Sequence, residues 1–315
     1  MTGPPTEPVE APAHAPAGHR VTHAEQIGVL LQALPYIQRF AGKVVVVKFG
    51  GNAMSPSLFA DFARDIVLMQ SVGLEPVVVH GGGPQIGEWL GRLGKTTEFV
   101  DGHRVTDAET LEIAQMVLMG KVNSDIVSAL NVHGPLAVGI SGQDAGLIRA
   151  EARHPELGFV GDVIGVNPSI IERLVAMELI PVISTIGSDA GGQAYNINAD
   201  AVASAIAEAL GAAKLLFLTD VPGLLRDVDD PSTLIPEITI SEARRLIEDG
   251  TISGGMRPKI EGCIRAIERG VGQVHLIDGR LDHVVLLELF TDAGVGTMVT
   301  ADPEFDAAAP IEVVP

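Results

Sequence analysis

The sequence is short of cysteine, aromatic residues and positive charge. Its single cysteine, Cys263, allows no intrachain disulfide, so we expect a reduced, cytoplasmic protein. Only 21 Lys and Arg residues face 40 Asp and Glu residues, and the net charge of -19 argues against binding to nucleic acid. No apolar run approaches the roughly 18 residues that a membrane span requires. An anionic ligand must therefore be held by a few local cations and by backbone N–H groups.

Glycine and aliphatic residues are abundant, with 36 glycines and a hydrophobic fraction of 46%. This composition is typical of α/β proteins with tight turns. Residues 1–20 are rich in Pro and Ala and predict a disordered tail. Residues 21–41 predict an amphipathic helix that Pro35 bends or interrupts. Because this helix precedes the first strand, its apolar stripe must pack on the core or on another subunit.

Short aliphatic runs alternate with helical patterns from residue 42 to residue 300. The alternation predicts βαβ units and a three-layer αβα sandwich around a mainly parallel open sheet. The expected strands are 44–49, 75–80, 135–141, 179–184, 214–220, 273–279 and 296–300, with a hairpin at 147–153 and 158–167. The expected helices are 57–71, 84–93, 107–130, 168–178, 197–211, 241–250 and 254–270. A C-terminal tail is expected at 301–315.

Glycine-rich turns directly follow four of the expected strands, at 48–51, 79–84, 140–146 and 184–192. Ligands of parallel sheets bind beyond the carboxyl ends of the strands, so we expect these turns to converge on one edge. The three glycines at 81–83 predict a chain that takes positive-φ or sterically tight conformations beside a ligand, and a purely structural loop is the alternative. Pro84 then begins a helix whose N-terminal N–H groups suit a carboxylate or a phosphate.

Several cations and polar residues stand beside these turns. Lys48 precedes two glycines, although the stretch does not match the P-loop pattern G-x-x-x-x-G-K-[ST]. Lys259 follows two other glycines near a helix start. Arg104 precedes a helix, and Asn196 and Asp200 lie around the N-terminus of another, where such residues also occur as ordinary caps. Each of these residues, taken alone, is also compatible with a structural or surface role.

The ordered stretches KFGGNAM, VVVHGGGPQI, DGHRVTD, YNINAD, LTDVPGLL and GGMRPKI resemble the amino-acid kinase superfamily, and within it the arginine-sensitive N-acetyl-L-glutamate kinases. The resemblance covers about residues 42–300. It implies ATP-dependent phosphorylation of the γ-carboxylate of N-acetyl-L-glutamate, the second step of arginine biosynthesis, with Mg²⁺ entering mainly with ATP. It also implies an N-acetylglutamate-binding lobe at 42–193 and a nucleotide-binding lobe at 194–300.

The resemblance also implies roles for individual residues. Lys48 and Lys259 flank the transferring phosphoryl group, and Asp200 organises the two lysines. N-acetylglutamate is held by Gly82, Gly83, Arg104 and Asn196. The nucleotide is held by Gly50, Gly51, Asp220, Val221, Pro222, Gly223, Leu224, Leu225, Thr251, Ile252 and Ser253. No protein ligand for a metal ion is implied.

The N-terminal helix resembles the additional helix of arginine-inhibited kinases, in which such helices interlace dimers into a ring-shaped hexamer. The resemblance implies a homo-oligomer built as a trimer of dimers. It also implies feedback inhibition by L-arginine in a pocket formed by Tyr36, His275, Glu288 and Gly294. The simpler alternative is an interface helix without an effector.

Two other functions stay open at this stage. The first is a kinase of the same superfamily for a different small acid or for a nucleoside monophosphate. Arg104 and the triple glycine do not by themselves distinguish N-acetylglutamate from aspartate, glutamate or carbamate. The second is a non-catalytic amino-acid sensor, which would have no use for two lysines and an acid at a phosphoryl site. A glutamate side chain, with a pKa of about 4.3, is already ionised at neutral pH, so the expected reaction needs no general base.

Overall fold

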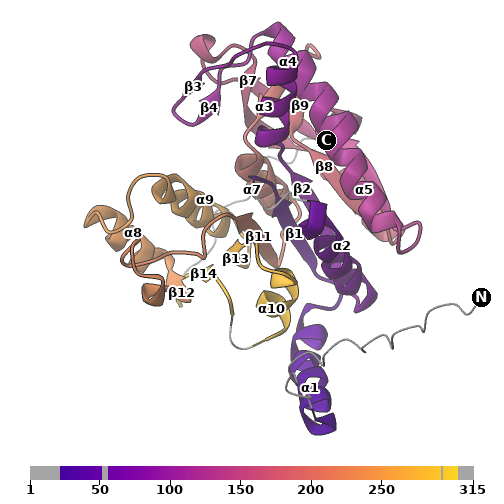
Figure 1. Ribbon diagram of the computed structural model, residues 1–315, viewed down its shortest axis with the longest axis vertical. Coiled ribbons are helices and arrows are strands. Elements are labelled where there is room, and N and C mark those ends of the chain that lie inside the picture. The colour runs from indigo at the N-terminus through magenta and orange to yellow at the C-terminus, as the bar shows by residue number, and fades with distance from the viewer. Residues whose placement is uncertain (1–21, 52–55, 292–293, 304–315) are drawn as a thin grey trace, which may run out of the picture.

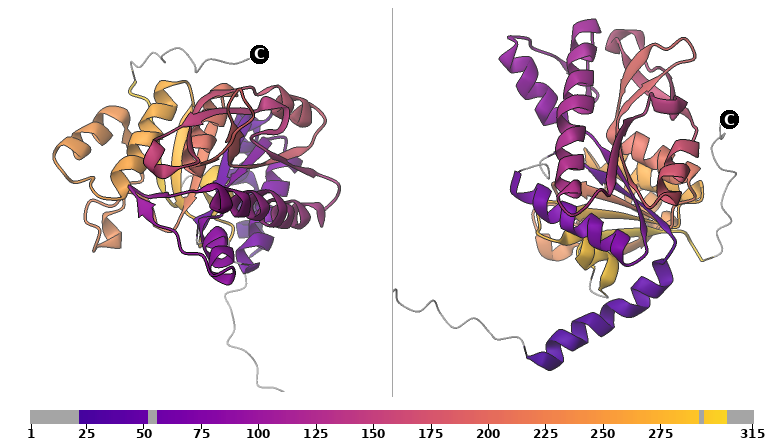
Figure 2. Two further views of the ribbon diagram at one scale, coloured as in Figure 1. Left: turned by 90° about the horizontal axis from the view of Figure 1, so that it is seen from above. Right: turned by 90° about the vertical axis from the view of Figure 1, so that its right-hand side faces the viewer.

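The computed structural model in Figure 1 describes residues 22–51, 56–291 and 294–303. The tail predicted at 1–20 and most of the predicted C-terminal tail lie outside these residues. A central sheet lies between two layers of helices, as Figure 2 shows, which confirms the expected αβα sandwich. None of the helices in the described part of the chain combines the length and the apolar composition that crossing a membrane needs.

The central sheet has eight strands in the order β12-β14-β13-β11-β1-β2-β8-β5. Neighbouring strands are parallel except for the antiparallel pair β13 and β14. The strands are β1 (Val44–Phe49), β2 (Glu75–His80), β5 (Ala137–Ser141), β8 (Ile180–Ser184), β11 (Lys214–Thr219), β12 (Glu237–Thr239), β13 (Gln273–Asp278) and β14 (Thr297–Thr300). The short strand β12 was not predicted.

The register of the sheet brings the predicted glycine turns together. Phe49 pairs with His80, His80 with Ser184, and Ser184 with Ser141, so four parallel strands end in one row. Each of the turns therefore begins at the same edge of the sheet. This row confirms that the turns converge.

Helices cover both faces of the sheet because each strand of its centre is apolar on both sides. One face packs on α1 (His23–Phe40), α2 (Pro56–Ser71), α3 (Gly83–Arg92), α4 (Ala108–Gln115), α5 (Asn123–Asn131) and α10 (Val284–Phe290). The other packs on α6 (Ser169–Ala176), α7 (Ala199–Ala209), α8 (Ile240–Glu248) and α9 (Met256–Glu268). Helix α10 was not predicted. Helix α1 runs through Pro35 without interruption.

The prediction of one continuous α-helix at 107–130 is wrong in one respect. Between α4 and α5 the chain forms a seven-residue π-helix, η2 (Met116–Val122). A π-helical turn holds more residues than an α-helical turn, so the face that α5 presents to the sheet differs from that of a continuous α-helix. Periodicity in the sequence did not reveal this insertion.

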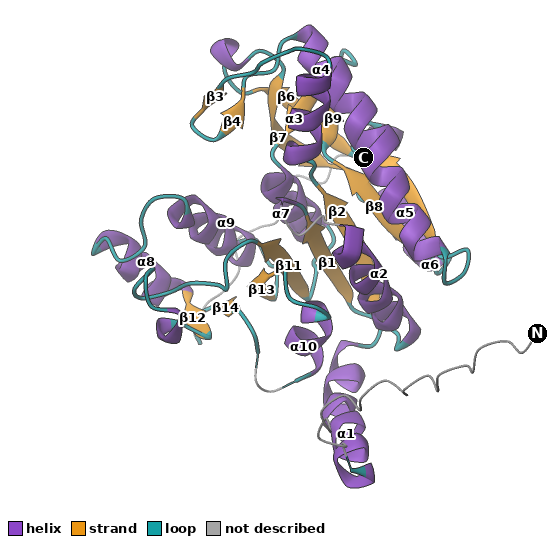
Figure 3. Cartoon of the chain, in the orientation of Figure 1, coloured by secondary structure: helices purple, strands orange, loops and turns teal. Residues whose placement is uncertain are grey.

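A small closed barrel extends beyond the sheet edge in Figure 3. It consists of β6 (Ile148–Ala152), β7 (Val160–Val166), β9 (Ile186–Ser188) and β10 (Ala194–Ile197). The antiparallel pair of β6 and β7 confirms the predicted hairpin, whereas β9 and β10 were not predicted. A second short hairpin consists of β3 (Phe99–Val100) and β4 (His103–Arg104). Single 3₁₀ turns occupy η3 (Asp144–Gly146), η4 (Pro155–Leu157) and η5 (Pro231–Thr233).

Candidate active site

Two lysines from distant parts of the chain meet at one carboxylate. Lys48 Nζ, near the end of β1, lies 2.9 Å from Asp200 Oδ1, and Lys259 Nζ of α9 lies 3.5 Å from Asp200 Oδ2. Asn198 caps α7 by accepting from the N–H of Asp200, which places the carboxylate in the first helical turn. The structure therefore brings together the three residues predicted to be catalytic.

Electrostatics keep this cluster charged. Partial burial of Asp200 opposes ionisation, but the positive charges of Lys48 and Lys259 outweigh it and hold the pKa of the carboxyl below its usual value. The side chain of Lys259 is 32% exposed and that of Asp200 is 34% exposed, so both face solvent. An incoming anion can reach the two ammonium groups from that side.

Gly50 lies directly against the lysine. A Cβ atom at Gly50 would be 3.4 Å from Lys48 Nζ and 3.6 Å from the backbone nitrogen of Gly81. The turn after β1 is therefore in contact with the turn after β2. Gly51 has a φ of 66°, which a residue with a side chain rarely adopts.

Close packing, rather than backbone conformation, explains two of the three glycines at 81–83. None of the three glycines at 81–83 has a φ in the left-handed region. A Cβ at Gly82 would lie 2.6 Å from Leu118 Cδ2, and one at Gly81 would lie 3.2 Å from Ala199 Cβ. Of the two explanations that the sequence left open, steric crowding is the one the structure supports. Gly83, which begins α3, is less crowded, since a Cβ there would meet none of the described residues within 4 Å.

Arg104 reaches the same turn from the β3–β4 hairpin. Its guanidinium donates to the carbonyl of Gly83 at 2.9 Å and to Thr97 Oγ1 at 2.7 Å, and it stacks on the ring of Phe99. Burial lowers the pKa of Arg104, and a guanidinium remains charged under such conditions. The predicted substrate residues Gly83 and Arg104 are therefore in direct contact.

Thr106 is a residue of this region that sequence reasoning missed. Its hydroxyl donates to the carbonyl of Arg104 at 2.7 Å and accepts from Asn196 Nδ2 at 3.4 Å. It is fully buried and so links the hairpin of Arg104 to strand β10, which carries Asn196. A threonine before a helix resembled an ordinary cap, and Asp107 is the residue that caps α4.

The predicted nucleotide residues divide into core residues and residues that are at least partly accessible to solvent. Leu224 and Ile252 are core residues, each 2% exposed, so neither side chain faces a ligand. The N–H of Leu224 donates to Thr297 Oγ1 at 2.8 Å, and a Cβ at Gly223 would lie 2.7 Å from the same oxygen. The side chains of Leu224 and Ile252 are therefore structural. The remaining positions are Asp220, Val221, Pro222, Leu225, Thr251 and Ser253.

Comparison with known proteins agrees with this geometry. Residues 43–278 match the profile of the Amino acid kinase family. The chain belongs to the amino acid kinase family. Acetylglutamate kinase from Nostoc sp. is 53% identical over 282 residues, which cover 89% of this chain and 95% of that protein.

This amino acid kinase is similar in structure to part of a longer protein. N-acetylglutamate synthase from Neisseria gonorrhoeae, complexed with coenzyme A and N-acetyl-glutamate, has a TM-score of 0.78 and 26% identity. The similarity covers 88% of this chain and 63% of the synthase chain. The same synthase complexed with coenzyme A and L-arginine has a TM-score of 0.75 and 25% identity, over 87% of this chain and 65% of that one.

A second cluster in this amino acid kinase contains three of the four residues that are predicted to bind L-arginine. His275 Nδ1 lies 2.6 Å from Glu288 Oε1, and the other carboxylate oxygen accepts from the N–H of Val295 at 2.7 Å. A Cβ at Gly294 would lie 3.7 Å from Glu288 Oε2. Tyr36 of α1 packs, half-buried, on the core cluster that contains α10.

Lys214 also belongs to this cluster and was missed. Its Nζ lies 2.9 Å from His275 Nε2 and 4.8 Å from the ring centre of Phe40 of α1. Burial lowers the pKa of Lys214 to about 8. The signal was available, since a lysine that begins an otherwise apolar strand needs a partner.

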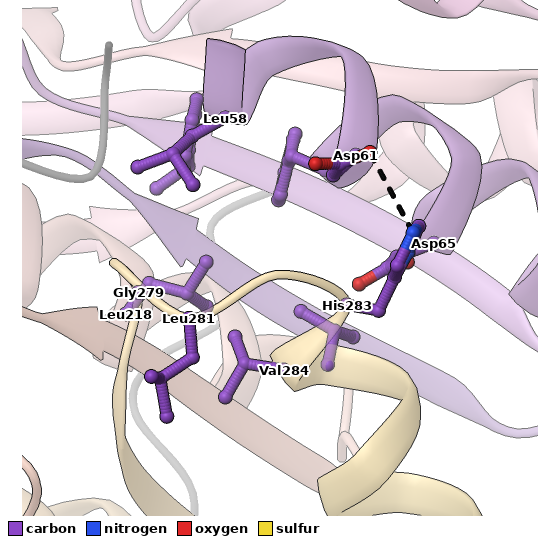
Figure 4. A pocket seen from close by; sticks show the side chains of 11 residues that line it. Leu58, Asp61, Asp65, Leu218, Gly279, Leu281, His283 and Val284 are labelled. Carbon is purple, nitrogen blue, oxygen red and sulfur yellow. Dashed lines mark hydrogen bonds and ion pairs between the residues drawn. The ribbon is translucent and has the colours of Figure 1, made fainter. Parts of the chain in front are cut away.

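Figure 4 shows a small pocket between α2, α10 and the end of β1 that none of the predicted site residues lines. His283 Nδ1 lies 2.6 Å from Asp65 Oδ1, and His283 Nε2 lies 3.5 Å from Asp61 Oδ1. Burial raises the pKa of Asp65 to about 6. This ion pair joins α10, which carries Glu288, to α2 and lies apart from the lysine cluster of the amino acid kinase.

Proposed function

We propose that this chain transfers the γ-phosphoryl group of ATP to the γ-carboxylate of N-acetyl-L-glutamate, forming N-acetyl-L-glutamyl 5-phosphate and ADP. The observation that carries the proposal is the pair of ammonium groups of Lys48 and Lys259 at one carboxylate, beside the turns that end β1 and β2. The acetylglutamate kinase of Nostoc sp., at 53% identity, supports this choice of acceptor.

The reaction follows from positioning and charge. A carboxylate oxygen of the substrate forms a bond to the γ-phosphorus, while the bond from that phosphorus to the bridging oxygen of ATP breaks and its electrons stay on ADP. No proton moves, because the attacking carboxylate is already ionised. Lys48 and Lys259 stabilise the negative charge on the transferring oxygens, and Asp200 keeps the two lysines together.

We assign the substrates to the two sides of this cluster. N-acetylglutamate binds within residues 42–193 at Gly82, Gly83 and Arg104, with Asn196 of the adjacent strand β10. The nucleotide binds within residues 194–300, and the turn at Gly50 and Gly51 supplies N–H groups to its phosphates. Among the described residues, no group of three or more His, Cys, Asp or Glu side chains is placed to hold a metal ion. Mg²⁺ therefore arrives as MgATP, with the phosphates as its main ligands.

An ATP-dependent assay that traps the acyl phosphate as a hydroxamate tests this function. We expect hydroxamate and ADP in equal amounts with N-acetylglutamate. Glutamate, aspartate and carbamate serve as controls, because each presents a carboxylate without the N-acetyl group. Faster ADP release with one of these controls would transfer the assignment to that acid. No ADP release with N-acetylglutamate or with any control acid would favour a sensor.

We propose that L-arginine inhibits the enzyme in a pocket formed by Tyr36, His275, Glu288 and Gly294, beside Lys214. Glu288 accepts two hydrogen bonds, and its remaining lone pairs suit a guanidinium group. Helix α1 covers the cluster through Phe40 and exposes a stripe of large apolar side chains beyond it. We assign this stripe to contacts between dimers in a hexamer. Its residues are Ile27, Leu30, Leu31 and Leu34, which are 57%, 73%, 61% and 46% exposed.

The arginine site predicts a loss of inhibition without a loss of activity. Substituting Glu288→Gln removes the charge that pairs with the guanidinium, and we expect the half-inhibitory arginine concentration to rise at least about tenfold. Deletion of residues 1–41 is expected to abolish inhibition and to reduce the particle mass in light scattering. Glu208→Gln is the matched control, since that side chain is also 4% exposed and paired with a cation. Unchanged inhibition in both altered proteins would contradict the assignment.

A further inference from the structure

A buried polar pair, His80 and Asn123, lies beneath the triple-glycine turn. His80 ends β2 and is fully buried, and Asn123, which begins α5 directly after the π-helix η2, is 6% exposed. The reaction described above uses neither side chain. Polar groups in such a position cost free energy unless their hydrogen bonds are satisfied, so their partners indicate what they do.

Hydrogen bonds define which nitrogen of His80 carries the proton. Asn123 Nδ2 donates to the carbonyl of Val182 at 2.9 Å and lies 3.1 Å from His80 Nε2. An amide nitrogen does not accept hydrogen bonds, so Nε2 is the acceptor and the proton is on Nδ1. Nδ1 then donates to the carbonyl of Gly81 at 3.0 Å. Burial lowers the pKa of His80 to about 4, which keeps the ring neutral.

This hydrogen bond sets the direction of one peptide plane. The carbonyl of Gly81 and the N–H of Gly82 belong to the same planar trans peptide and point in opposite directions. With the carbonyl held on the buried ring, the N–H of Gly82 points away from His80. The N–H of Gly81 is also held, because it donates to the carbonyl of Phe49 at 3.1 Å. Both peptide groups of Gly81 are thus fixed, one by β1 and the other by His80.

The π-helix η2 packs directly against the turn. Leu118 of η2 contacts Gly82 so closely that a Cβ there would lie 2.6 Å from the leucine methyl group. The same helix leads into Asn123, whose Oδ1 would lie 1.8 Å from a Cβ at Gly139. π-helical turns often occur at functional sites. Here the turn places one apolar and one polar side chain under the glycines.

We propose that His80, held by Asn123, is a positioning residue for substrate binding. It fixes the carbonyl of Gly81 so that the N–H of Gly82, at the N-terminus of α3, faces the carboxylate of N-acetylglutamate. The inference rests on the proposed function, which names the ligand. The required feature is the hydrogen-bond donor at the Nδ1 position, not the imidazole ring itself.

Two substitutions distinguish the role of Nδ1 from that of Nε2 in the ring of His80. His80→Asn places an amide N–H near the position of Nδ1 and keeps the donor to Gly81. His80→Gln places its amide near the position of Nε2, so it keeps the contact with Asn123 and loses the donor. We expect the KM for N-acetylglutamate to rise about tenfold with Gln and less than about threefold with Asn. The KM for ATP should stay unchanged in both variants, because the turn after β1 keeps its bonds.

Measuring the Tm of both variants distinguishes a positioning role of His80 from an effect on stability alone. Both variants leave a cavity and should lose Tm by similar amounts, so a role confined to stability predicts equal KM values. Equal KM values, or a larger rise with Asn than with Gln, would overturn the positioning role. If the Gln variant does not fold, His80→Leu, which also lacks the donor, takes its place in the comparison. Absent turnover of the wild-type protein would reject the proposed function and this inference together, whereas normal turnover with equal KM values rejects the inference alone.

Discussion

Substituting Lys48→Met is expected to lower kcat about 10³-fold while the protein still folds. Methionine keeps most of the length and apolar character of the side chain, which is only 13% exposed. Asp200 keeps Lys259 as a partner at 3.5 Å, so no uncompensated charge remains in the site. The loss should therefore fall on the transition state, where one of two cations facing the phosphoryl oxygens is missing.

Initial rates at saturating ATP and N-acetylglutamate measure this effect. Lys43→Met is the matched control, because Lys43 is an exposed lysine just before the opposite end of the same strand. We expect the control variant to keep the wild-type kcat and Tm. A Lys48→Met enzyme with kcat within tenfold of the wild type would remove this lysine from the mechanism, and Lys259→Met tests the second cation in the same way.

Substituting Asp200→Asn is expected to lower kcat about 10²-fold. The amide preserves the shape of the side chain but removes the charge that holds two ammonium groups within one site. At separations of about 4 Å, repulsion between unit charges costs about 1 to 4 kcal/mol, so the two lysines are expected to separate. Because the lysines hold the pKa of Asp200 below its usual value, the loss of kcat should not vary with pH around neutrality.

Glu172 provides a matched control for the Asp200→Asn substitution. Glu172 is an exposed acid in the first turn of α6, so Glu172→Gln changes a helix N-terminus without touching the lysines. We expect wild-type turnover from that variant. If Asp200→Asn also retained wild-type turnover, the carboxylate would be an ordinary first-turn acid, as the sequence alone allowed.

Strand ends and their glycine turns were predictable because they depend on local pattern. Four valines followed by a lysine and two glycines predict a buried strand with a cation at its carboxyl end. The parallel arrangement of such strands then predicts that their turns meet. By the same argument, the helix that begins at Pro84 supplies N–H groups at that edge. The αβα fold and the neighbourhood of the site followed from these features.

Tertiary structure alone revealed the buried groups that support the site. Lys214 and His275 are 61 residues apart, and His80 and Asn123 are 43 apart. No local pattern brings either pair together, since their contacts depend on strand order and register. The π-helix and helix α10 escaped prediction for a related reason. Their short patterns are decided by packing against the sheet rather than by intrinsic preference.

The sequence by itself determined the layered fold, the edge at which ligands bind, and the identity of Lys48, Asp200 and Lys259 as a candidate set. Tertiary structure decided that the three side chains touch, that Gly81 and Gly82 are crowded rather than left-handed, and that a histidine lies beneath them. The reason is physical. Periodicity and turn chemistry act over a few residues, whereas hydrogen bonds and steric contacts between distant segments exist only after the sheet has fixed their register.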